Sequence, residues 1–193
     1  MIHDPSNRCP EHDIVQLLAL METEEAQGRA LLAQLIQAYP GDERLHFLDG
    51  SLLAADRDYG AAREAMQRAV ELAPGFALAR FQLGFLLLSS GEADAALASL
   101  APLRQLPDED PLRSFAEGLE HLIRDDFDDA IRLLEQGIAL NTHNQPLNHD
   151  MALLVREMRA RQESAGKASQ DEEPVLSAAQ QLLQQAALKS TRH

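Results

Sequence analysis

The sequence has few aromatic residues, no tryptophan and a single cysteine. Aromatic residues make up 4% of the 193 residues, and β-branched residues are also sparse beside the many alanines and leucines. This composition disfavours β-sheet and favours helices that approach one another closely, so we predict an all-α fold. Cys9 has no partner for an intramolecular disulfide, which agrees with a reducing compartment. We therefore expect a cytoplasmic protein.

Basic residues and long apolar runs are scarce as well. The chain carries 17 lysines and arginines against 31 aspartates and glutamates, a net charge of -14. Such a charge repels phosphate backbones, so nucleic acid is not an expected partner. No apolar run approaches the roughly 20 residues needed to span a bilayer. The segment Met1 to Asp13 is polar and has no apolar core typical of a signal peptide.

Motifs for catalysis or metal binding are missing too. The sequence contains no glycine-rich phosphate loop, no GxSxG turn and no HExxH pair. The spacing of His3, Cys9 and His12 matches no paired metal motif. The acidic run from Asp125 to Asp129 is typical of a helix start that faces solvent. We expect no enzymatic activity, no metal and no cofactor.

What the sequence does contain is a period of 34 residues. Three glycines, Gly50, Gly84 and Gly118, follow this spacing, and so do three alanines, Ala62, Ala96 and Ala130. The period divides the chain into units 43–76, 77–110 and 111–144, each with two amphipathic stretches around a short polar turn. Units of this length form helix-turn-helix pairs that bury their apolar faces by stacking. The small residues let the paired helices approach closely.

These units resemble the tetratricopeptide repeat. The first unit matches best, and the others keep part of the same pattern: Gly50, Tyr59, Ala62, Met66, Ala69 and Pro74; then Leu83, Gly84, Leu87, Gly91, Ala96 and Leu100; then Gly118, Phe127, Ala130 and Leu134. They depart from it where the family has a bulky aromatic residue in the first helix, since His46, Arg80 and Ser114 stand there. The resemblance implies a right-handed solenoid of helix-turn-helix repeats.

Segments on either side complete the predicted organisation. Residues 1–10 are expected to be a flexible tail, 11–42 a degenerate fourth repeat, 145–163 a capping helix and 164–174 a linker. The last segment, 175–193, is predicted to contain an amphipathic helix, because Val175, Ala179, Leu182, Leu183 and Ala186 follow helical spacing. A helix of about 15 residues is marginal in water, so this one needs a surface to lie on.

A series of phenylalanines gives the candidate binding site. Phe47, Phe81 and Phe115 lie 34 residues apart, at a position that faces the concave groove in the family that the repeats resemble. The full set expected to line this groove is Phe47, Leu78, Phe81, Phe85, Leu88, Leu112, Phe115, Leu119 and Leu122. Alternatively, the phenylalanines fill the space left by the missing aromatic residue one position earlier. Both interpretations stay open at this point.

The groove positions also indicate the kind of ligand. Some members of the family hold a carboxylate terminus with basic residues, but the corresponding positions here hold no basic residue: Phe47, Ser51, Gln82, Leu112 and Ala116. We therefore predict an adaptor or chaperone-like module that binds an apolar or amphipathic segment of a partner protein, with basic residues flanking it. In the alternative hypothesis the C-terminal helix fills the groove, either of its own chain or of a neighbour in a homo-oligomer.

Overall fold

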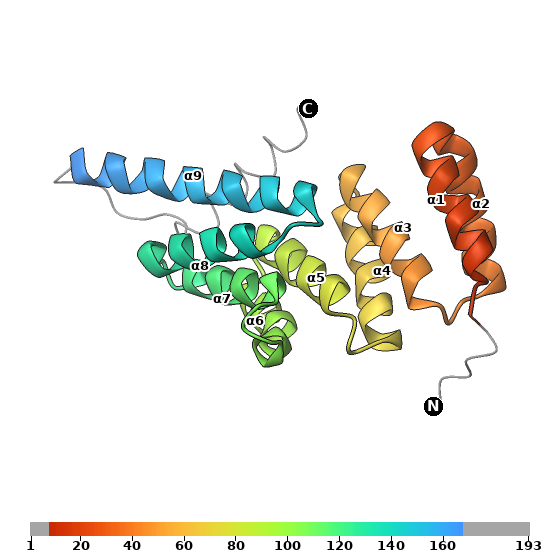
Figure 1. The fold of residues 1–193 in the computed structure, drawn as a ribbon, viewed down its shortest axis with the longest axis horizontal. Coiled ribbons are helices and arrows are strands. Elements are labelled where there is room, and N and C mark those ends of the chain that lie inside the picture. The colour runs from red at the N-terminus through yellow and green to blue at the C-terminus, as the bar shows by residue number, and fades with distance from the viewer. Residues whose placement is uncertain (1–7, 168–193) are drawn as a thin grey trace. The chain divides into compact units, whose positions relative to one another are not determined.

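The computed structural model describes residues 8–167, and every regular element in this range is a helix. The predicted all-α fold is confirmed (Figure 1). The helices are α1 (Glu11–Thr23), α2 (Glu25–Ala38), α3 (Glu43–Ala55), α4 (Tyr59–Leu72), α5 (Ala77–Ser89), α6 (Ala93–Leu100), the 3₁₀ helix η2 (Ala101–Gln105), α7 (Pro111–Ile123), α8 (Phe127–Leu140) and α9 (Gln145–Lys167). They form two compact units, Met1–Ala79 and Arg80–His193.

The first unit is built from two helix pairs, α1 with α2 and α3 with α4. Its core collects apolar side chains from the first three helices and from Cys9, which precedes α1: Cys9, Ile14, Leu17, Leu32, Leu35 and Leu45. Aspartates define two of the helix starts, since the Asp42 carboxylate accepts from the Arg44 amide and the Asp58 carboxylate from the Ala61 amide. Residues 11–42, predicted as a degenerate repeat, thus form a helix pair.

In the second unit, α6 and η2 pack against α7. Helix α7 then pairs with α8, and α8 with α9. Figure 1 shows α9 running alongside α8. Asp110 starts α7, because its carboxylate accepts from the Leu112 amide while Pro111 occupies the first turn. The side chains of Met151, Leu154 and Met158 on α9 are fully buried. This helix therefore covers an apolar face of the second unit.

The repeat period reappears in the turns between paired helices. Arg57, Gly91 and Asp125 lie 34 residues apart, and all three have a left-handed backbone, with φ of 65°, 83° and 56°. Two of them are not glycine, so the left-handed conformation is imposed by the turn and not by residue preference alone. The same turn geometry in the three predicted repeats supports the register that the sequence predicts.

The three glycines of the 34-residue period lie where paired helices approach closely. A Cβ atom added at Gly50 would lie 2.8 Å from Met66 Cγ, and one at Gly84 would lie 2.7 Å from Leu100 Cγ. At Gly118 the added atom would lie 2.8 Å from Leu134 Cδ2. Carbon atoms do not approach this closely, so a side chain at any of the three positions would force its neighbour to shift. The close approach predicted from the 34-residue spacing is present in the structure.

Replacing Gly118 by alanine should therefore destabilise the protein. Overpacking at the α7–α8 crossing is expected to lower the free energy of unfolding by about 1 to 3 kcal/mol, more than the helix propensity of alanine returns. Gly60→Ala is the matched control, since the nearest atom to its added Cβ is 3.9 Å away. Because Gly60 lies in the first turn of α4, that substitution should leave the free energy of unfolding nearly unchanged. Urea denaturation measures both changes, and a Gly118→Ala protein as stable as Gly60→Ala would contradict the crossing.

Helix α6 is short, and α9 is longer than the sequence predicts. In the predicted repeat 77–110, the second helix, α6, has eight residues and passes into η2. Pro102 lies in the first turn of η2. Proline lacks the amide hydrogen and disturbs an α-helix interior, so the chain tightens there and still buries Leu103. At the other end, α9 continues to Lys167, four residues beyond the predicted cap 145–163.

Both ends of the described region extend into segments that were predicted to be a tail or a linker. Ser164 was predicted to begin a linker, but its hydroxyl donates to the Ala160 carbonyl within α9. In the predicted tail 1–10, residues 8–10 are described and Cys9 is buried there. Residues 1–7, most of the linker 164–174 and the predicted C-terminal helix lie outside the described residues.

Candidate functional site

Five of the nine side chains predicted to line a groove lie in the interior of the second unit. Their exposed fractions are 2% or less: Phe81, Leu88, Phe115, Leu119 and Leu122. The rings of Phe81 and Phe115 contact each other in a tilted arrangement with centroids 5.9 Å apart. Side chains buried to this degree contact other core residues, as expected if the phenylalanines fill the space of the missing aromatic residue.

The other four predicted residues keep part of their surface exposed. Phe47 and Leu78 belong to the first unit, whereas Phe85 and Leu112 belong to the second. Phe47 packs against Phe76 with ring centroids 5.0 Å apart, and Phe85 stacks on Phe81 at 6.4 Å. Phe47 and Phe85 therefore pack in part against other side chains of their own unit. That they contact a partner stays a prediction.

A groove that the sequence analysis did not predict lies between α8 and α9. Its volume is about 700 Å³, and its lining residues come from these two helices alone: Glu135, Ile138, Ala139, Ala152, Val155, Arg156, Arg159, Ala160 and Glu163. The floor is apolar, and small side chains make room for it, because Ala139, Ala152 and Ala160 are exposed. The alanines are visible in the sequence, but nothing there shows that those of the two helices face the same space.

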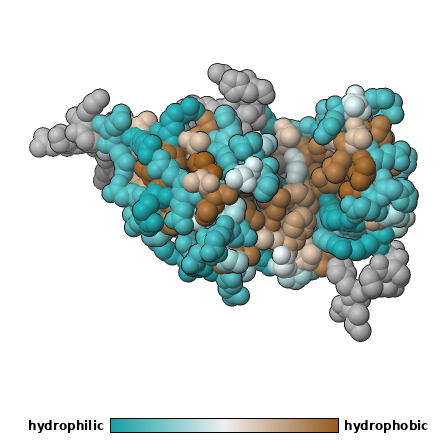
Figure 2. Space-filling view, viewed as in Figure 1, coloured by the Kyte–Doolittle hydropathy of each residue, from teal (hydrophilic) through white to brown (hydrophobic). Residues whose placement is uncertain are grey.

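Charged residues of both signs form the rim of this groove. Arg159 Nη2 pairs with Glu135 Oε1 at 2.7 Å, which joins α9 to α8. Arg156 and Glu163 add one charge of each sign along α9. On the face drawn in Figure 2, hydrophobic residues likewise gather in patches that hydrophilic residues border. An apolar floor with a charged rim is suited to an amphipathic ligand.

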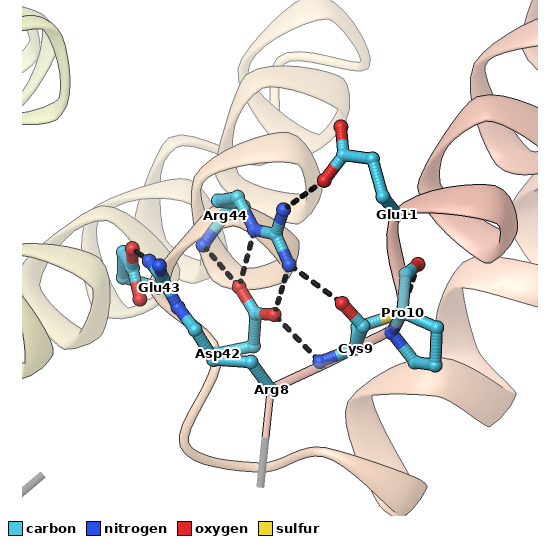
Figure 3. Close-up of polar contacts among 7 residues, drawn as sticks. All are labelled: Arg8, Cys9, Pro10, Glu11, Asp42, Glu43 and Arg44. Atoms are coloured by element: carbon cyan, nitrogen blue, oxygen red, sulfur yellow. Dashed lines mark hydrogen bonds and ion pairs between the residues drawn. The ribbon is translucent and has the colours of Figure 1, made fainter. Parts of the chain in front are cut away.

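A buried polar cluster lies at the start of the first unit (Figure 3). The Asp42 carboxylate is 0% exposed, and it accepts from the Cys9 amide at 2.9 Å and from Arg44 Nη2 at 2.7 Å. Burial by itself would raise the pKa of Asp42, but the hydrogen bonds from Arg44 and from the Cys9 amide outweigh it and lower this pKa. Arg44 also donates to the Cys9 carbonyl and to Glu11.

This cluster holds the chain in place and offers no reactive group. Burial, followed by the nearby charges of Asp13 and Asp42, raises the pKa of the Cys9 thiol, and the side chain is 3% exposed. A thiol that stays protonated and inaccessible is a poor nucleophile. Glu43 pairs with Arg8 through one carboxylate oxygen, while its Oε2 is buried without a hydrogen-bond partner. We assign the cluster a structural role.

A second polar cluster joins α7 to the start of α8. The ligand-capable atoms of His121, Asp126 and Asp129 lie within 4.8 Å of one another. His121 Nδ1 contacts Asp126 Oδ2 at 2.9 Å, and Arg132 donates to Asp129 at 2.6 Å. The hydrogen bond from Arg132 lowers the pKa of Asp129. Because each side chain already has a protein partner, the geometry does not indicate a metal site.

Comparisons with known proteins agree with this architecture. A family model of the tetratricopeptide repeat matches residues 53–113. No curated protein sequence matches the chain. Among solved structures, MamA 41-end from Desulfovibrio magneticus RS-1 has a similar fold, with a TM-score of 0.57 and 14% identity. The similarity covers 95% of this chain and 97% of that chain.

Among the helices of residues 8–167, none is both long enough and apolar enough to cross a membrane.

Paired helices at a 34-residue period, close crossings at three glycines and the match to the family model together identify the repeats. Proteins built from such repeats are typically interaction scaffolds, so this chain carries a protein-interaction module. The chain carries tetratricopeptide repeats, which the family model matches over residues 53–113.

Proposed function

We propose that the protein is an adaptor or chaperone-like module that binds an apolar or amphipathic segment of a partner protein. The observation that carries this proposal is the groove between α8 and α9. Its volume of about 700 Å³ lies within the range of typical ligand sites, and its floor is apolar over two helices. An amphipathic helix that places apolar side chains on such a floor is a common mode of recognition in repeat and groove-forming proteins.

The charge of the chain supports a partner with basic flanks. The net charge of -14 favours association with basic segments over acidic ones, and Glu135 and Glu163 lie at the rim of the groove. The proposal includes the partly exposed Phe47, Leu78, Phe85 and Leu112 as further contacts, each within its own unit. It needs no catalytic step, and a cytoplasmic location is consistent with the lone cysteine.

A model peptide tests the proposal directly. The probe is a fluorescein-labelled amphipathic peptide with leucines at helical spacing and lysines at both ends, titrated with the full chain by fluorescence anisotropy. Ala152→Glu puts a carboxylate on the exposed part of the groove floor. Since a docked leucine would desolvate this carboxylate without pairing it, we expect binding to weaken about tenfold or more.

An exposed alanine outside the groove gives the matched control. Ala98→Glu makes the same chemical change on α6 of the same unit, where the side chain is exposed and is not part of the groove. It should bind the peptide as the unchanged protein does. If the two glutamate variants bind equally well, the α8–α9 groove is not the binding site. If no protein binds the peptide, the proposed function fails.

A further inference from the structure

We propose that the chain's own C-terminal segment, Val175 to Leu188, occupies the α8–α9 groove and runs antiparallel to α9. The inference rests on the groove of the proposed function and names a regulator of that site. Residues 168–193 lie outside the described part of the chain, so the argument uses their sequence alone. Their apolar positions, Val175, Ala179, Leu182, Leu183 and Ala186, follow helical spacing.

The tether is long enough for the segment to turn back. Helix α9 ends at Lys167, and seven residues, 168–174, connect it to Val175. An extended chain of this length spans about 25 Å. Glu163, the groove residue nearest the end of α9, precedes Lys167 by four residues, or about 6 Å along the helix. The segment can therefore reverse direction and enter the groove from this end.

The groove and the segment also match in length. The wall that α9 contributes runs from Ala152 to Glu163, eleven residue steps or about 16 Å in a helix. The helically spaced apolar stripe of the segment runs from Val175 to Ala186, which is again eleven steps, and Leu188 lies beyond it. In an antiparallel arrangement Val175 would lie opposite the Glu163 end and Ala186 opposite Ala152. The apolar stripe would then cover the floor along its whole length.

Charge favours the antiparallel arrangement. The acidic residues Asp171, Glu172 and Glu173 come just before the segment, so reversal places them beside the last turns of α9. With Val175 opposite Glu163, these acidic residues lie opposite residues 165–167, and the basic Lys167 is among them. Glutamines at 180, 181, 184 and 185 occupy the polar positions of the segment and carry no charge that would oppose docking. Opposite charges at the entry of the groove set the orientation more than the affinity.

Docking within one chain has an advantage over docking of a separate partner. A short tether gives an effective concentration on the order of 1 mM. A segment with an intrinsic dissociation constant on the order of 0.1 mM would then fill the groove in about nine chains of ten, and a partner would bind about tenfold more weakly. The C-terminal segment thus sets a threshold for partner binding, and it keeps the apolar floor covered while no partner is present.

Engineered disulfides in the full chain test the position and the direction of the segment. Ala152→Cys with Ala186→Cys and Ala160→Cys with Ala178→Cys should each form an intramolecular disulfide under mild oxidation, since the antiparallel arrangement places both pairs opposite each other. The swapped pairs, 152 with 178 and 160 with 186, use the same four positions and should not. Native Cys9 is buried with a raised thiol pKa and stays unreactive. Mass spectrometry after proteolysis identifies the bonds.

Each outcome of this experiment decides the question. Disulfides in the two matched pairs and not in the swapped pairs support antiparallel docking. Swapped pairs that form equally well, or matched pairs that do not form, overturn it. Disulfides that link two chains show that the occupant is a second copy, which also overturns it.

The labelled peptide separates this inference from the proposed function. Leu182→Asp with Leu183→Asp removes two apolar anchors from the segment and should raise the affinity of the full chain for the peptide about tenfold. If the peptide binds the Asp double variant and the unchanged chain equally, but not Ala152→Glu, the proposed function stands and the inference fails. If the matched disulfides form while no variant binds the peptide, the inference stands and the proposed function fails.

Discussion

Replacing Asp42 by alanine is expected to destabilise the first unit by about 2 to 4 kcal/mol, because a helix cap is lost and a buried donor is left unpaired. The Asp42 carboxylate caps the start of α3 by accepting a hydrogen bond from the Arg44 amide. It also accepts from the Cys9 amide, so among the side chains in Figure 3 it alone joins this amide to Arg44. Without it, the buried Cys9 amide has no acceptor there and the Arg44 guanidinium has lost its closest counter-charge. Urea denaturation followed by far-UV circular dichroism measures the change.

Asp58→Ala provides the matched control, because Asp58 also starts a helix but is exposed and caps it through a single 3.2 Å contact. It should cost about 1 kcal/mol. Equal losses in the two variants would show that Asp42 acts as a cap alone.

Acid should remove the difference that Asp42 makes. The pKa of Asp42 is lowered in the folded protein by its hydrogen bonds, although burial opposes this. Its contribution to stability is therefore complete above the unfolded pKa of about 3.9 and is lost as the pH falls through the lower folded value. The gap in unfolding free energy between the unchanged protein and Asp42→Ala should narrow below about pH 4. A gap that stays constant down to pH 2 would contradict the role of the carboxylate.

The sequence predicts the repeats because their period is encoded in residues that local geometry demands. Gly50, Gly84 and Gly118 are at the crossings where no Cβ fits, so their 34-residue spacing reports the helix pairs directly. The amphipathic stretches between them then locate the helices. Pro102 interrupts one of these stretches, and the effect on α6 could have been read from proline chemistry.

Features that depend on contacts between distant segments could not be predicted in this way. Asp42 meets Cys9 across 33 residues, and nothing in the local sequence of either indicates the other. The α8–α9 groove arises because exposed alanines of two helices happen to face the same space. Likewise, the register places phenylalanines at one position of the repeat, but it does not say whether that position is at the surface or in the core.

Phe115→Ala is expected to lower the free energy of unfolding by about 3 to 5 kcal/mol, as truncation of a buried phenylalanine does in other cores. The ring is 0% exposed and contacts Phe81. It also lies directly on the α8 backbone, since a Cβ added at Gly137 would overlap the ring. Alanine would leave a cavity between α7 and α8 that neither helix can close without losing its own contacts.

Phe85→Ala makes the control, because the same ring is removed from a side chain that is partly exposed. It should cost less than about half as much stability as Phe115→Ala. The two variants also separate the two interpretations of the phenylalanine series, when denaturation is combined with titration of the labelled peptide. Truncating a core residue lowers the unfolding midpoint, whereas truncating a ligand anchor weakens peptide binding in a protein of unchanged stability. We expect the first result for Phe115, and a Phe115→Ala protein of normal stability that binds the peptide poorly would return this residue to the binding surface.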